Sequence, residues 1–374
     1  MPSTIEILFW LAGGLIWYTY FGYAALISIL SLLRPRMTMV GNIEPTVTLL
    51  IPAYNEEKVI AAKIENSLSL NYPPDKLKIL VVADGSDDET AAISRRYSGV
   101  EVAFQPERRG KAAALNRVIP DVQTQIVLFS DANTFYAPDS LKAMVRHFAD
   151  PAVGGVTGEK RVRGGGEGLY WRYESFLKGK DSRVSSVMGA AGEIFAMRRG
   201  AFLAPEEDSI IEDFVMSMRL VAQGWRVVYE PEAIAFEPAS PSLVVDWDRR
   251  TRIAAGGFQS ITRMPEMLDL RRGLMVWQYV SHRVLRWAVA PVLLPVILTT
   301  NILLWPKRIY RVFFFGQMAF YGLASLGFLQ ARRGRSRGLP GSAFYFVLAN
   351  AAALAGLIRF LRRRQPVTWR KARR

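Results

Sequence analysis

Short apolar runs alternate with amphipathic helical patterns through the middle of the chain, from about residue 42 to 260. Each apolar run has the length and composition of a buried strand, and apolar residues at helical spacing follow it. Four such pairs are TVTLLIPAY with EEKVIAAKIENSLSL, KLKILVVADGS with DETAAISRRY, VEVAFQP with KAAALNRVI, and QIVLFSD with PDSLKAMVRHF. This alternation predicts an α/β fold, in which helices cover both faces of a mostly parallel sheet.

Four longer apolar stretches lie outside this segment, at residues 7–33, 287–305, 312–331 and 338–358. Each has about the 20 apolar residues that a bilayer-spanning helix needs. Residues 270–286 mix arginine with Trp, Leu and Val at helical spacing, which favours a helix in the membrane interface.

Four parts of the chain follow from these patterns. They are an N-terminal membrane helix with a linker (1–41), an α/β domain (42–260), an interfacial helix region (261–286), and C-terminal membrane helices with a basic tail (287–374).

Basic residues near the first apolar stretch predict its orientation. No Lys or Arg precedes this stretch, whereas Arg34 and Arg36 follow it. Because basic residues collect on the cytoplasmic side, we expect the N-terminus outside the cell inner or plasma membrane and the α/β domain in the cytoplasm. Three simple crossings would place the basic tail outside, against this tendency. A cytoplasmic tail, which the tendency favours, would result if 287–305 dips into the membrane and returns.

The net charge of +15 is unevenly distributed along the chain. After Asp269 the chain has 19 Lys and Arg and no acidic residue, so the preceding part is slightly acidic. A nucleic-acid-binding protein would carry its basic patch on the folded domain. Here the excess borders the apolar stretches, where it sets membrane orientation. The composition therefore predicts contact with membrane lipids and no nucleic-acid partner.

Composition also limits the metal chemistry. The chain has no cysteine and two histidines, His147 and His282. An ordinary zinc site and a cysteine nucleophile are therefore excluded. Any metal must bind oxygen ligands, which points to Mg²⁺ or Mn²⁺.

Polar clusters follow three of the predicted strands, at Tyr54–Glu56, Asp84–Asp87 and Asp131–Asn133. In parallel sheets, ligands bind beyond the carboxyl ends of the strands, so these clusters are expected to converge. Asp131 and Asn133 are two residues apart and point the same way from an extended chain. Together they can hold a divalent cation against a diphosphate.

Six segments of the chain, in order, resemble motifs of the family 2 glycosyltransferases with the GT-A fold. They are IPAYNEE (51–57), VVADGSDDET (81–90), RGKAAALN (109–116), FSDANT (129–134), IIEDFVMSMRL (210–220) and DRRTRIAAGG (248–257). The resemblance covers about residues 44–260. It is strongest to the membrane-embedded synthases of cellulose, chitin, hyaluronan and poly-N-acetylglucosamine, and it implies a Rossmann-like GT-A domain flanked by transmembrane helices.

The resemblance implies a role for each matching residue. Tyr54, Glu56 and Asp84 correspond to positions that bind the uridine of a UDP-sugar, and Lys111 to a motif lining the nucleotide pocket. Asp131 and Asn133 occupy the outer positions of the Asp-x-Asp motif, which contacts nucleotide and metal. Asp213 matches the catalytic aspartate, the general base. Arg249, Arg250 and Arg252 align with the Gln-x-x-Arg-Trp motif, in which Arg250 and Arg252 would bind the pyrophosphate.

Asp213 also opens a predicted helix, and the helix dipole favours negative charge there. We therefore expect its carboxylate to ionise readily, with a low pKa, and to accept the proton of the acceptor hydroxyl late in the reaction.

Two positions depart from the family pattern. Asn133 replaces a carboxylate, so the metal site has one charge fewer. Ile253 replaces a tryptophan that stacks on the acceptor sugar in polymerising members, although Trp247 or Phe258 offers another stacking face.

Three functions are consistent with these residues. The first is an inverting β-glycosyltransferase that moves one sugar from a nucleotide-sugar, expected to be a UDP-sugar, to a glycan or lipid acceptor at the membrane. The second is a processive synthase of the poly-N-acetylglucosamine type. The third is a non-catalytic, nucleotide-sugar-binding subunit of a synthase. The few apolar stretches favour the first, and the retained acids and arginines disfavour the third. The sugar, which would depend on loops such as 161–168, and the oligomeric state are not fixed by the sequence.

Overall fold

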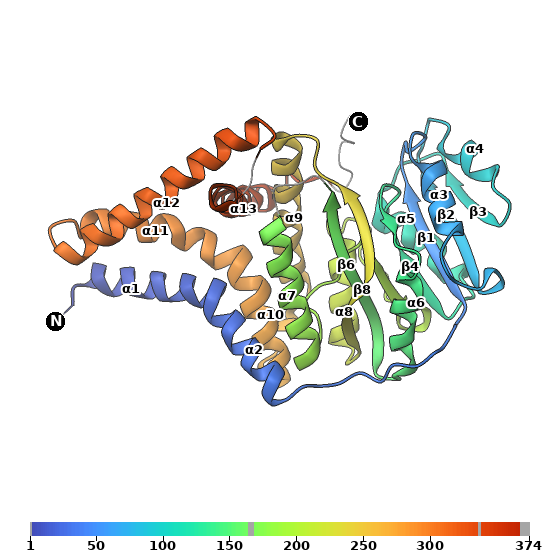
Figure 1. Ribbon diagram of the computed structural model, residues 1–374, viewed down its shortest axis with the longest axis horizontal. Helices are drawn as coiled ribbons and strands as arrows, with labels where there is room; N and C mark the ends of the chain where they lie inside the picture. The colour runs from blue at the N-terminus through green and yellow to red at the C-terminus, as the bar shows by residue number, and fades with distance from the viewer. Residues whose placement is uncertain (1, 164–167, 336–337, 367–374) are drawn as a thin grey trace.

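The computed structural model describes residues 2–163, 168–335 and 338–366. It has two parts, an α/β domain built around one sheet and a set of long apolar helices that extend away from it (Figure 1). The loop at 161–168, expected to influence donor choice, and the end of the basic tail lie partly outside the described residues.

An eight-stranded sheet forms the centre of the α/β domain, in the order β3-β2-β1-β4-β7-β6-β8-β5. The strands are β1 (Val47–Ala53), β2 (Leu77–Asp84), β3 (Val100–Gln105), β4 (Ile126–Phe129), β5 (Phe135–Tyr136), β6 (Val153–Arg163), β7 (Phe195–Arg198) and β8 (Arg226–Pro238). Strands β3, β2, β1 and β4 are parallel neighbours, β6 and β8 are also parallel, and β7 and β5 are antiparallel to their neighbours. The expected α/β fold with a mostly parallel sheet is confirmed.

Helices cover both faces of this sheet. The helices of the domain are α3 (Ile60–Leu68), α4 (Thr90–Arg95), α5 (Lys111–Val118), α6 (Ser140–Val145), α7 (Gly168–Val184), α8 (Glu212–Ala222) and α9 (Leu243–Arg263). Successive strand residues point to opposite faces. Accordingly, Leu50 packs in one core with residues of α5 and α8, whereas Leu49 and Ile51 pack in the other with residues of α3 and α6.

Four apolar helical runs are each long enough to cross a membrane, among the described residues, which indicates an integral membrane protein. The first joins α1 (Thr4–Trp17), η1 (Tyr18–Gly22) and α2 (Tyr23–Leu33); the second joins α10 (Leu274–Tyr279), η8 (Val280–Val289) and α11 (Ala290–Leu303); the third is α12 (Arg308–Arg332) and the fourth α13 (Gly338–Leu361). Large apolar side chains on these helices face outward: Leu11 is 66 % and Val312 68 % exposed. Such exposed apolar surface is typical of a lipid-facing region.

The second run differs from the two separate segments expected at 270–286 and 287–305. Helix continues from Leu274 to Leu303 without a return, and α1 packs along α11. At the far end of the bundle Lys307 pairs with Glu6 at 2.7 Å. The return of the chain within 287–305, considered above as one route to a cytoplasmic tail, is not seen in this described segment, since the helix runs the length of the bundle (Figure 1).

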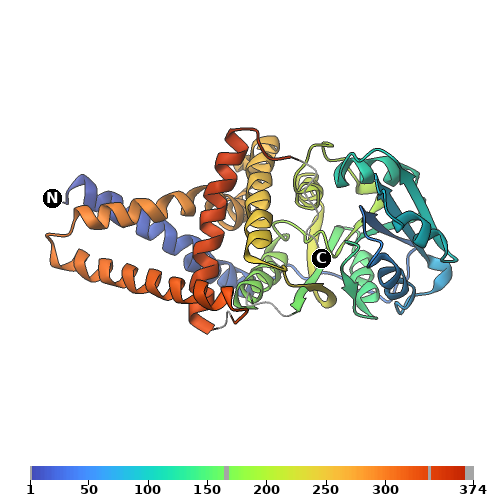
Figure 2. The ribbon, with the colours of Figure 1, turned by 90° about the horizontal axis from the view of Figure 1, so that it is seen from above.

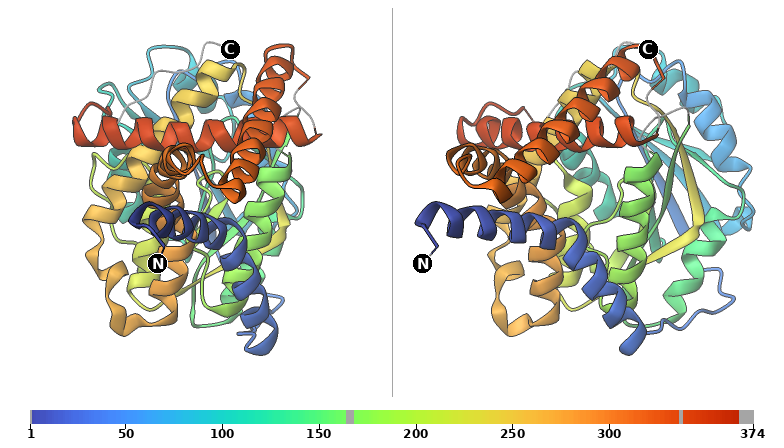
Figure 3. Two further views of the ribbon diagram at one scale, coloured as in Figure 1. Left: turned by 90° about the vertical axis from the view of Figure 1, so that its left-hand side faces the viewer. Right: turned by 60° about the vertical axis from the view of Figure 1, so that its left-hand side comes forward.

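Helix α13 lies crosswise to α1, α11 and α12 and alongside α9, between the bundle and the α/β domain (Figures 2 and 3). The two helices approach closely at Gly356, where an added Cβ would lie 2.6 Å from the Cβ of Ala254 and 2.8 Å from the carbonyl of Thr251. Arg359 also pairs with Asp248 at 2.9 Å. A helix apolar enough to span a membrane thus supports the helix that carries the predicted arginine motif.

Candidate active site

The predicted site residues meet at one edge of the sheet because the strands that carry them are adjacent and parallel. β1 pairs with β2 on one side and with β4 on the other. Tyr54 follows β1, Asp84 ends β2, and Asp131 follows β4 by two residues. The convergence expected from the sequence is therefore observed.

Asp84 is buried and bound by the loop before α5. Its carboxylate accepts hydrogen bonds from the backbone N–H groups of Arg109 at 3.1 Å and Gly110 at 2.7 Å. Gly110 has a φ of +100°, which favours glycine. The loop is thereby fixed over the end of β2, and Lys111 is directed into the site as the first residue of α5.

The end of β1 is held against the end of β2. Asn55 and Asp87 exchange two hydrogen bonds, from the Asn55 amide to the Asp87 carboxylate and from the Asp87 N–H to the Asn55 side chain. The backbone N–H of Glu56 donates to Thr90 at 2.7 Å. The Arg108 guanidinium lies over the Tyr54 ring, 3.6 Å from its centroid. These contacts place Tyr54 and Glu56 beside Asp84.

Lys111 joins two acidic groups at the centre of the site. Its Nζ lies 2.8 Å from Asp131 and 2.9 Å from Glu212, the first residue of α8. Burial opposes the charged amine, but Asp131 and Glu212 outweigh it and raise the pKa of Lys111 well above its ordinary value. Lys111 therefore stays positively charged next to the expected diphosphate position.

Asp213 follows Glu212 and accepts a hydrogen bond from the backbone N–H of Gly192 at 2.8 Å. Its pKa is raised to about 6, first by burial and then by the negative charge of Glu212, against the opposing effect of Lys111. The expectation of a low pKa from the helix dipole is wrong, because dehydration and a neighbouring carboxylate exceed the dipole. A base with a pKa near 6 is better matched to proton transfer at neutral pH.

The activity should therefore depend on pH in a defined way. Turnover at saturating donor should fall as the pH is lowered through about 6, because a protonated Asp213 cannot accept a proton. Glu212→Gln should move this fall, the acidic limb of the pH–rate profile, to lower pH, since it removes a charge that raises the pKa of Asp213. An acidic limb that does not move in Glu212→Gln would argue that another group titrates.

The three arginines of α9 point in different directions. Arg252 is turned toward α8 and donates to the carbonyl of Ile210 at 2.8 Å. Arg249 pairs with Glu193 at 3.1 Å and Glu237 at 3.3 Å, and these acids raise its pKa against the effect of burial.

Arg250 lies on another side of the helix. It pairs with Asp246 at 3.0 Å, and its guanidinium lies over the rings of Tyr170 and Tyr345, at 5.5 and 5.6 Å. Arg249 contacts acids of the site, Glu193 and Glu237, whereas the contacts described for Arg250 are with Asp246, Tyr170 and Tyr345. The pyrophosphate contact of Arg250 stays a prediction.

Glu193 and Lys160 belong to the site but were not among the residues expected from the sequence. Buried Lys160 forms ion pairs with both Glu193 and Glu237, and these three side chains form one ion cluster with Arg249. Burial disfavours the charged carboxylate, but Lys160 and Arg249 lower the pKa of Glu193 overall. The sequence signal that could have identified Glu193 is the segment GEIF (192–195). Gly192 of this segment also provides the N–H that binds Asp213.

One of the two alternative stacking residues, Phe258, is covered in the structure. Phe258 is 8 % exposed and stacks on Phe360 of α13, so it is not available to an acceptor sugar. Trp287 of η8 packs edge-on against Phe214, the residue after Asp213, with ring centroids 5.1 Å apart. A tryptophan from the membrane-proximal helix thus lies next to the base.

The side-chain oxygens that follow β4, from Asp131 and Asn133, are ligands of the type that Mg²⁺ and Mn²⁺ prefer. No group of three or more Asp, Glu, His or Cys that could hold a metal is found among the described residues. Asp131 is 35 % exposed at its side chain and Asn133 lies two residues on. Mg²⁺ is commonly held by one or two protein oxygens, waters and substrate phosphates, and the oxygens of Asp131 and Asn133 are of this kind.

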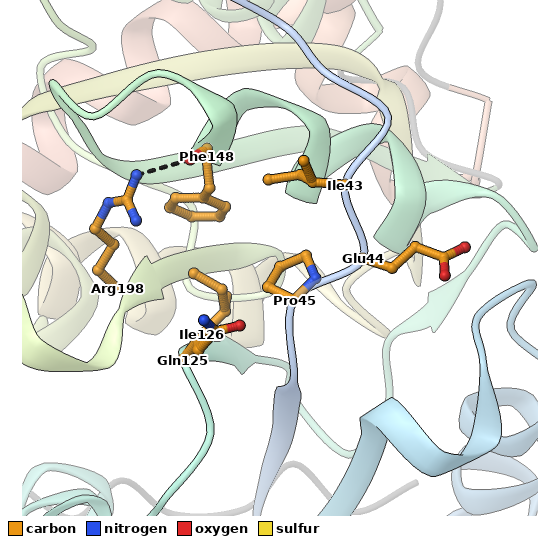
Figure 4. Close-up of a pocket in the computed structure, with 7 residues that line it drawn as sticks. All are labelled: Ile43, Glu44, Pro45, Gln125, Ile126, Phe148 and Arg198. Carbon is orange, nitrogen blue, oxygen red and sulfur yellow. Dashed lines mark hydrogen bonds between the residues drawn. The ribbon is translucent and has the colours of Figure 1, made fainter.

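A separate pocket lies at the opposite end of the same strands. Its lining includes Pro45 before β1 and Ile126 at the start of β4, and its volume is about 390 Å³. Arg198 crosses it to donate to the carbonyl of Phe148 at 2.8 Å (Figure 4). None of the expected site residues lines it.

The sheet carries acids near the carboxyl ends of its strands, and α5 and α9 add a lysine and arginines. Residues 48–204 match the sequence model of Glycosyl transferase family 2. Over this segment the chain is similar to the family 2 glycosyltransferases.

Two curated relatives have related chemistry. A poly-beta-1,6-N-acetyl-D-glucosamine synthase of Staphylococcus aureus is 31 % identical over 232 residues, which cover 58 % of this chain and 56 % of the relative. A beta-monoglucosyldiacylglycerol synthase of Synechocystis sp. is 27 % identical over 259 residues, covering 65 % and 52 %. The chain spans about half the length of these relatives.

One solved structure resembles almost the whole chain. The mannosyltransferase PcManGT of Pyrobaculum calidifontis, in complex with GDP-Man and Mn²⁺, superposes with a TM-score of 0.74 over 96 % of this chain and 99 % of that protein, at 21 % identity. The likeness shows that the two proteins share a fold, including the apolar helices.

Proposed function

We propose that the chain is an inverting β-glycosyltransferase that moves a sugar from a UDP-sugar to a lipid or glycan acceptor at the cytoplasmic membrane face. The observation that carries this proposal is Asp213, which combines a raised pKa with a position next to Lys111 and the acids of the donor edge. Tyr54, Glu56 and Asp84 would bind the nucleoside.

The reaction follows from these positions. Asp213 accepts the proton of the acceptor hydroxyl while the acceptor oxygen bonds to the anomeric carbon and the bond to the diphosphate breaks. Lys111, Arg249 and Arg252 stabilise the diphosphate as negative charge develops on it. One displacement from the opposite face turns an α-linked donor into a β-glycoside.

A divalent cation would be held by Asp131 and Asn133, where it supplies further charge neutralisation for the leaving diphosphate. Excess EDTA should therefore abolish transfer, and added Mg²⁺ or Mn²⁺ should restore it. Asn133→Asp should keep activity and lower the metal concentration needed for half-maximal rate, because a carboxylate binds the cation more strongly than an amide. Full turnover in EDTA, or an unchanged metal dependence in Asn133→Asp, would contradict this assignment.

Single addition is favoured over polymer synthesis. Helices α1, α11 and α12 form a small bundle, and α13 lies crosswise to this bundle and alongside α9 (Figures 2 and 3). This leaves little helical material around a polymer path. A processive synthase of the poly-N-acetylglucosamine type is the second candidate, supported by the Staphylococcus relative.

The donor and the product size are tested together. Membranes containing the protein are incubated with labelled UDP-sugars and with GDP-mannose, and label is measured in the lipid extract and in the polymer fraction. Single addition predicts label in the lipid extract from one UDP-sugar. Label confined to long polymer would support the second candidate, and label from GDP-mannose alone would overturn the choice of UDP.

The arrangement of helices favours a cytoplasmic α/β domain with the N-terminus outside. If α1, α11 and α12 cross the membrane and α13 lies in its plane, the Glu6–Lys307 end is outside, and the α/β domain and tail are inside. The chain has no cysteine, so a single cysteine can report each side. A membrane-impermeant maleimide should label Arg308→Cys in intact cells and Arg333→Cys only after permeabilisation. The reverse pattern would invert the topology.

A further inference from the structure

Two arginines lie within an apolar helical run that is long enough to cross a membrane. Arg283 and Arg286 belong to Leu274–Leu303, and their side chains are only 14 % and 12 % exposed. Charged residues in such helices are costly and usually mark a functional site. They also lie in η8, a ten-residue π-helix, and π-helical segments are rare and frequently functional.

The two guanidinium groups share a single carboxylate. Arg286 pairs with Glu174 of α7, and Arg283 Nη1 lies 3.5 Å from the same carboxylate. Burial opposes ionisation of Glu174, but Arg286, His282 and Arg283 hold its pKa well below the ordinary value. Arg283 also donates to the carbonyl of Met188. Two positive charges therefore face one negative charge.

Most other polar groups around this pair contact one another, and His282 also lies 3.6 Å from Glu174. His282 contacts Asp181 at 2.5 Å, and Asp181 also binds Tyr23 and Gln278. On α9, Arg250 pairs with Asp246. Lys178 of α7 also faces Glu174, but burial lowers its pKa. Among the described residues, no ion pair joins Asp181 or Asp246 to Arg283 or Arg286, so the excess positive charge stays on the arginine pair.

A short loop connects the arginine pair to the base. Met188, whose carbonyl binds Arg283, begins the segment that ends at Gly192, whose N–H binds Asp213. The Arg283 guanidinium also lies over the ring of Phe214, 6.0 Å from its centroid, and over that of Trp287 at 5.7 Å. Arg283 thus contacts both the segment that holds Asp213 and the residue that follows Asp213.

We propose that Arg283 and Arg286 bind the phosphate of a phosphate-bearing lipid, so that the acceptor hydroxyl of this lipid reaches Asp213. Paired guanidinium groups suit phosphate oxygens because they donate parallel charge-assisted hydrogen bonds. A neutral lipid would leave the second arginine without a counter-charge. The proposal rests on the proposed function for its hydroxyl at Asp213, but the phosphate site can be measured without turnover.

Lipid retention tests this site directly. The purified full-length protein in detergent is mixed with dioleoylphosphatidic acid or dioleoylglycerol, which share their acyl chains, and bound lipid is counted by native mass spectrometry. We expect at least about tenfold preference for phosphatidic acid, about the effect of one charge-assisted contact. Arg283→Gln/Arg286→Gln should abolish the preference. The control Arg333→Gln/Arg335→Gln, which changes two exposed arginines at the end of α12, should keep it. Equal loss in both double variants would overturn the proposal in favour of general attraction to basic surface.

Glu174→Gln provides a test in the opposite direction. Because it removes the counter-charge and leaves both arginines, retention of phosphatidic acid should rise, whereas a purely structural ion pair would give no rise. Thermal unfolding shows which variants fold, and binding of UDP in the same samples separates the two proposals. Lipid preference without any nucleotide binding would remove the proposed function and keep the phosphate site. Nucleotide binding without lipid preference would remove the phosphate site and keep the proposed function.

Discussion

Replacing Asp213 with asparagine should lower kcat by at least about 100-fold, because general-base contributions are typically about 100- to 10,000-fold. The amide keeps the size of the side chain and the start of α8 but cannot accept a proton. UDP affinity should be nearly unchanged, since the nucleoside contacts are assigned to Tyr54, Glu56 and Asp84. The measurement is kcat at saturating donor together with a UDP titration.

Arg252→Ala is the paired variant, because Arg252 is assigned to the diphosphate rather than to the proton. It should weaken UDP binding as well as turnover. If Asp213→Asn loses UDP binding and keeps turnover at saturating donor, Asp213 is a nucleotide ligand. Glu212 would then be the next candidate for the base.

Replacing Lys111 with methionine should lower the free energy of unfolding by about 3 kcal/mol, because it leaves the buried carboxylate of Glu212 without its cation. Glu212 is 8 % exposed at its side chain, whereas Asp131 is 35 % exposed and screened by water, so the loss is assigned to Glu212. UDP binding should also weaken, since the diphosphate loses a cation. Denaturant unfolding in detergent measures the first effect.

Two further variants separate this effect from a general loss of charge. Lys111→Met/Glu212→Gln should recover much of the stability, because the buried charge is removed with its partner. Lys142→Met, at an exposed lysine of α6, should change the free energy of unfolding by less than about 0.5 kcal/mol. A stable Lys111→Met protein would show that water or another cation compensates Glu212.

The part of the fold that could be predicted from the sequence is the part set by local pattern. The strands that end near Ala53, Asp84 and Phe129 are recognisable in the sequence as short apolar runs. The polar residues that end or follow these strands converge because parallel strands end at the same edge of the sheet. The family motifs then gave the residues expected to bind donor and acceptor.

Three features depended on tertiary packing and were not predicted. The pKa of Asp213 is raised by its burial next to Glu212, which the dipole argument at a helix start does not include. The direction of Arg250 depends on how α9 rotates against α7 and α13. Helix α13 has a composition suited to spanning, yet Gly356 allows it to pack closely along α9. Composition gives length and polarity, but it does not give the packing partner.

The anomeric configuration of the product tests the central claim most directly. The purified protein is incubated with the α-linked UDP-sugar selected by the donor panel and with membrane lipid, and the transferred sugar is examined by proton NMR in the lipid extract. A single β-linked sugar, formed by the wild type and lost in Asp213→Asn, is the result expected from one displacement with Asp213 as base. An α-linked product would contradict it.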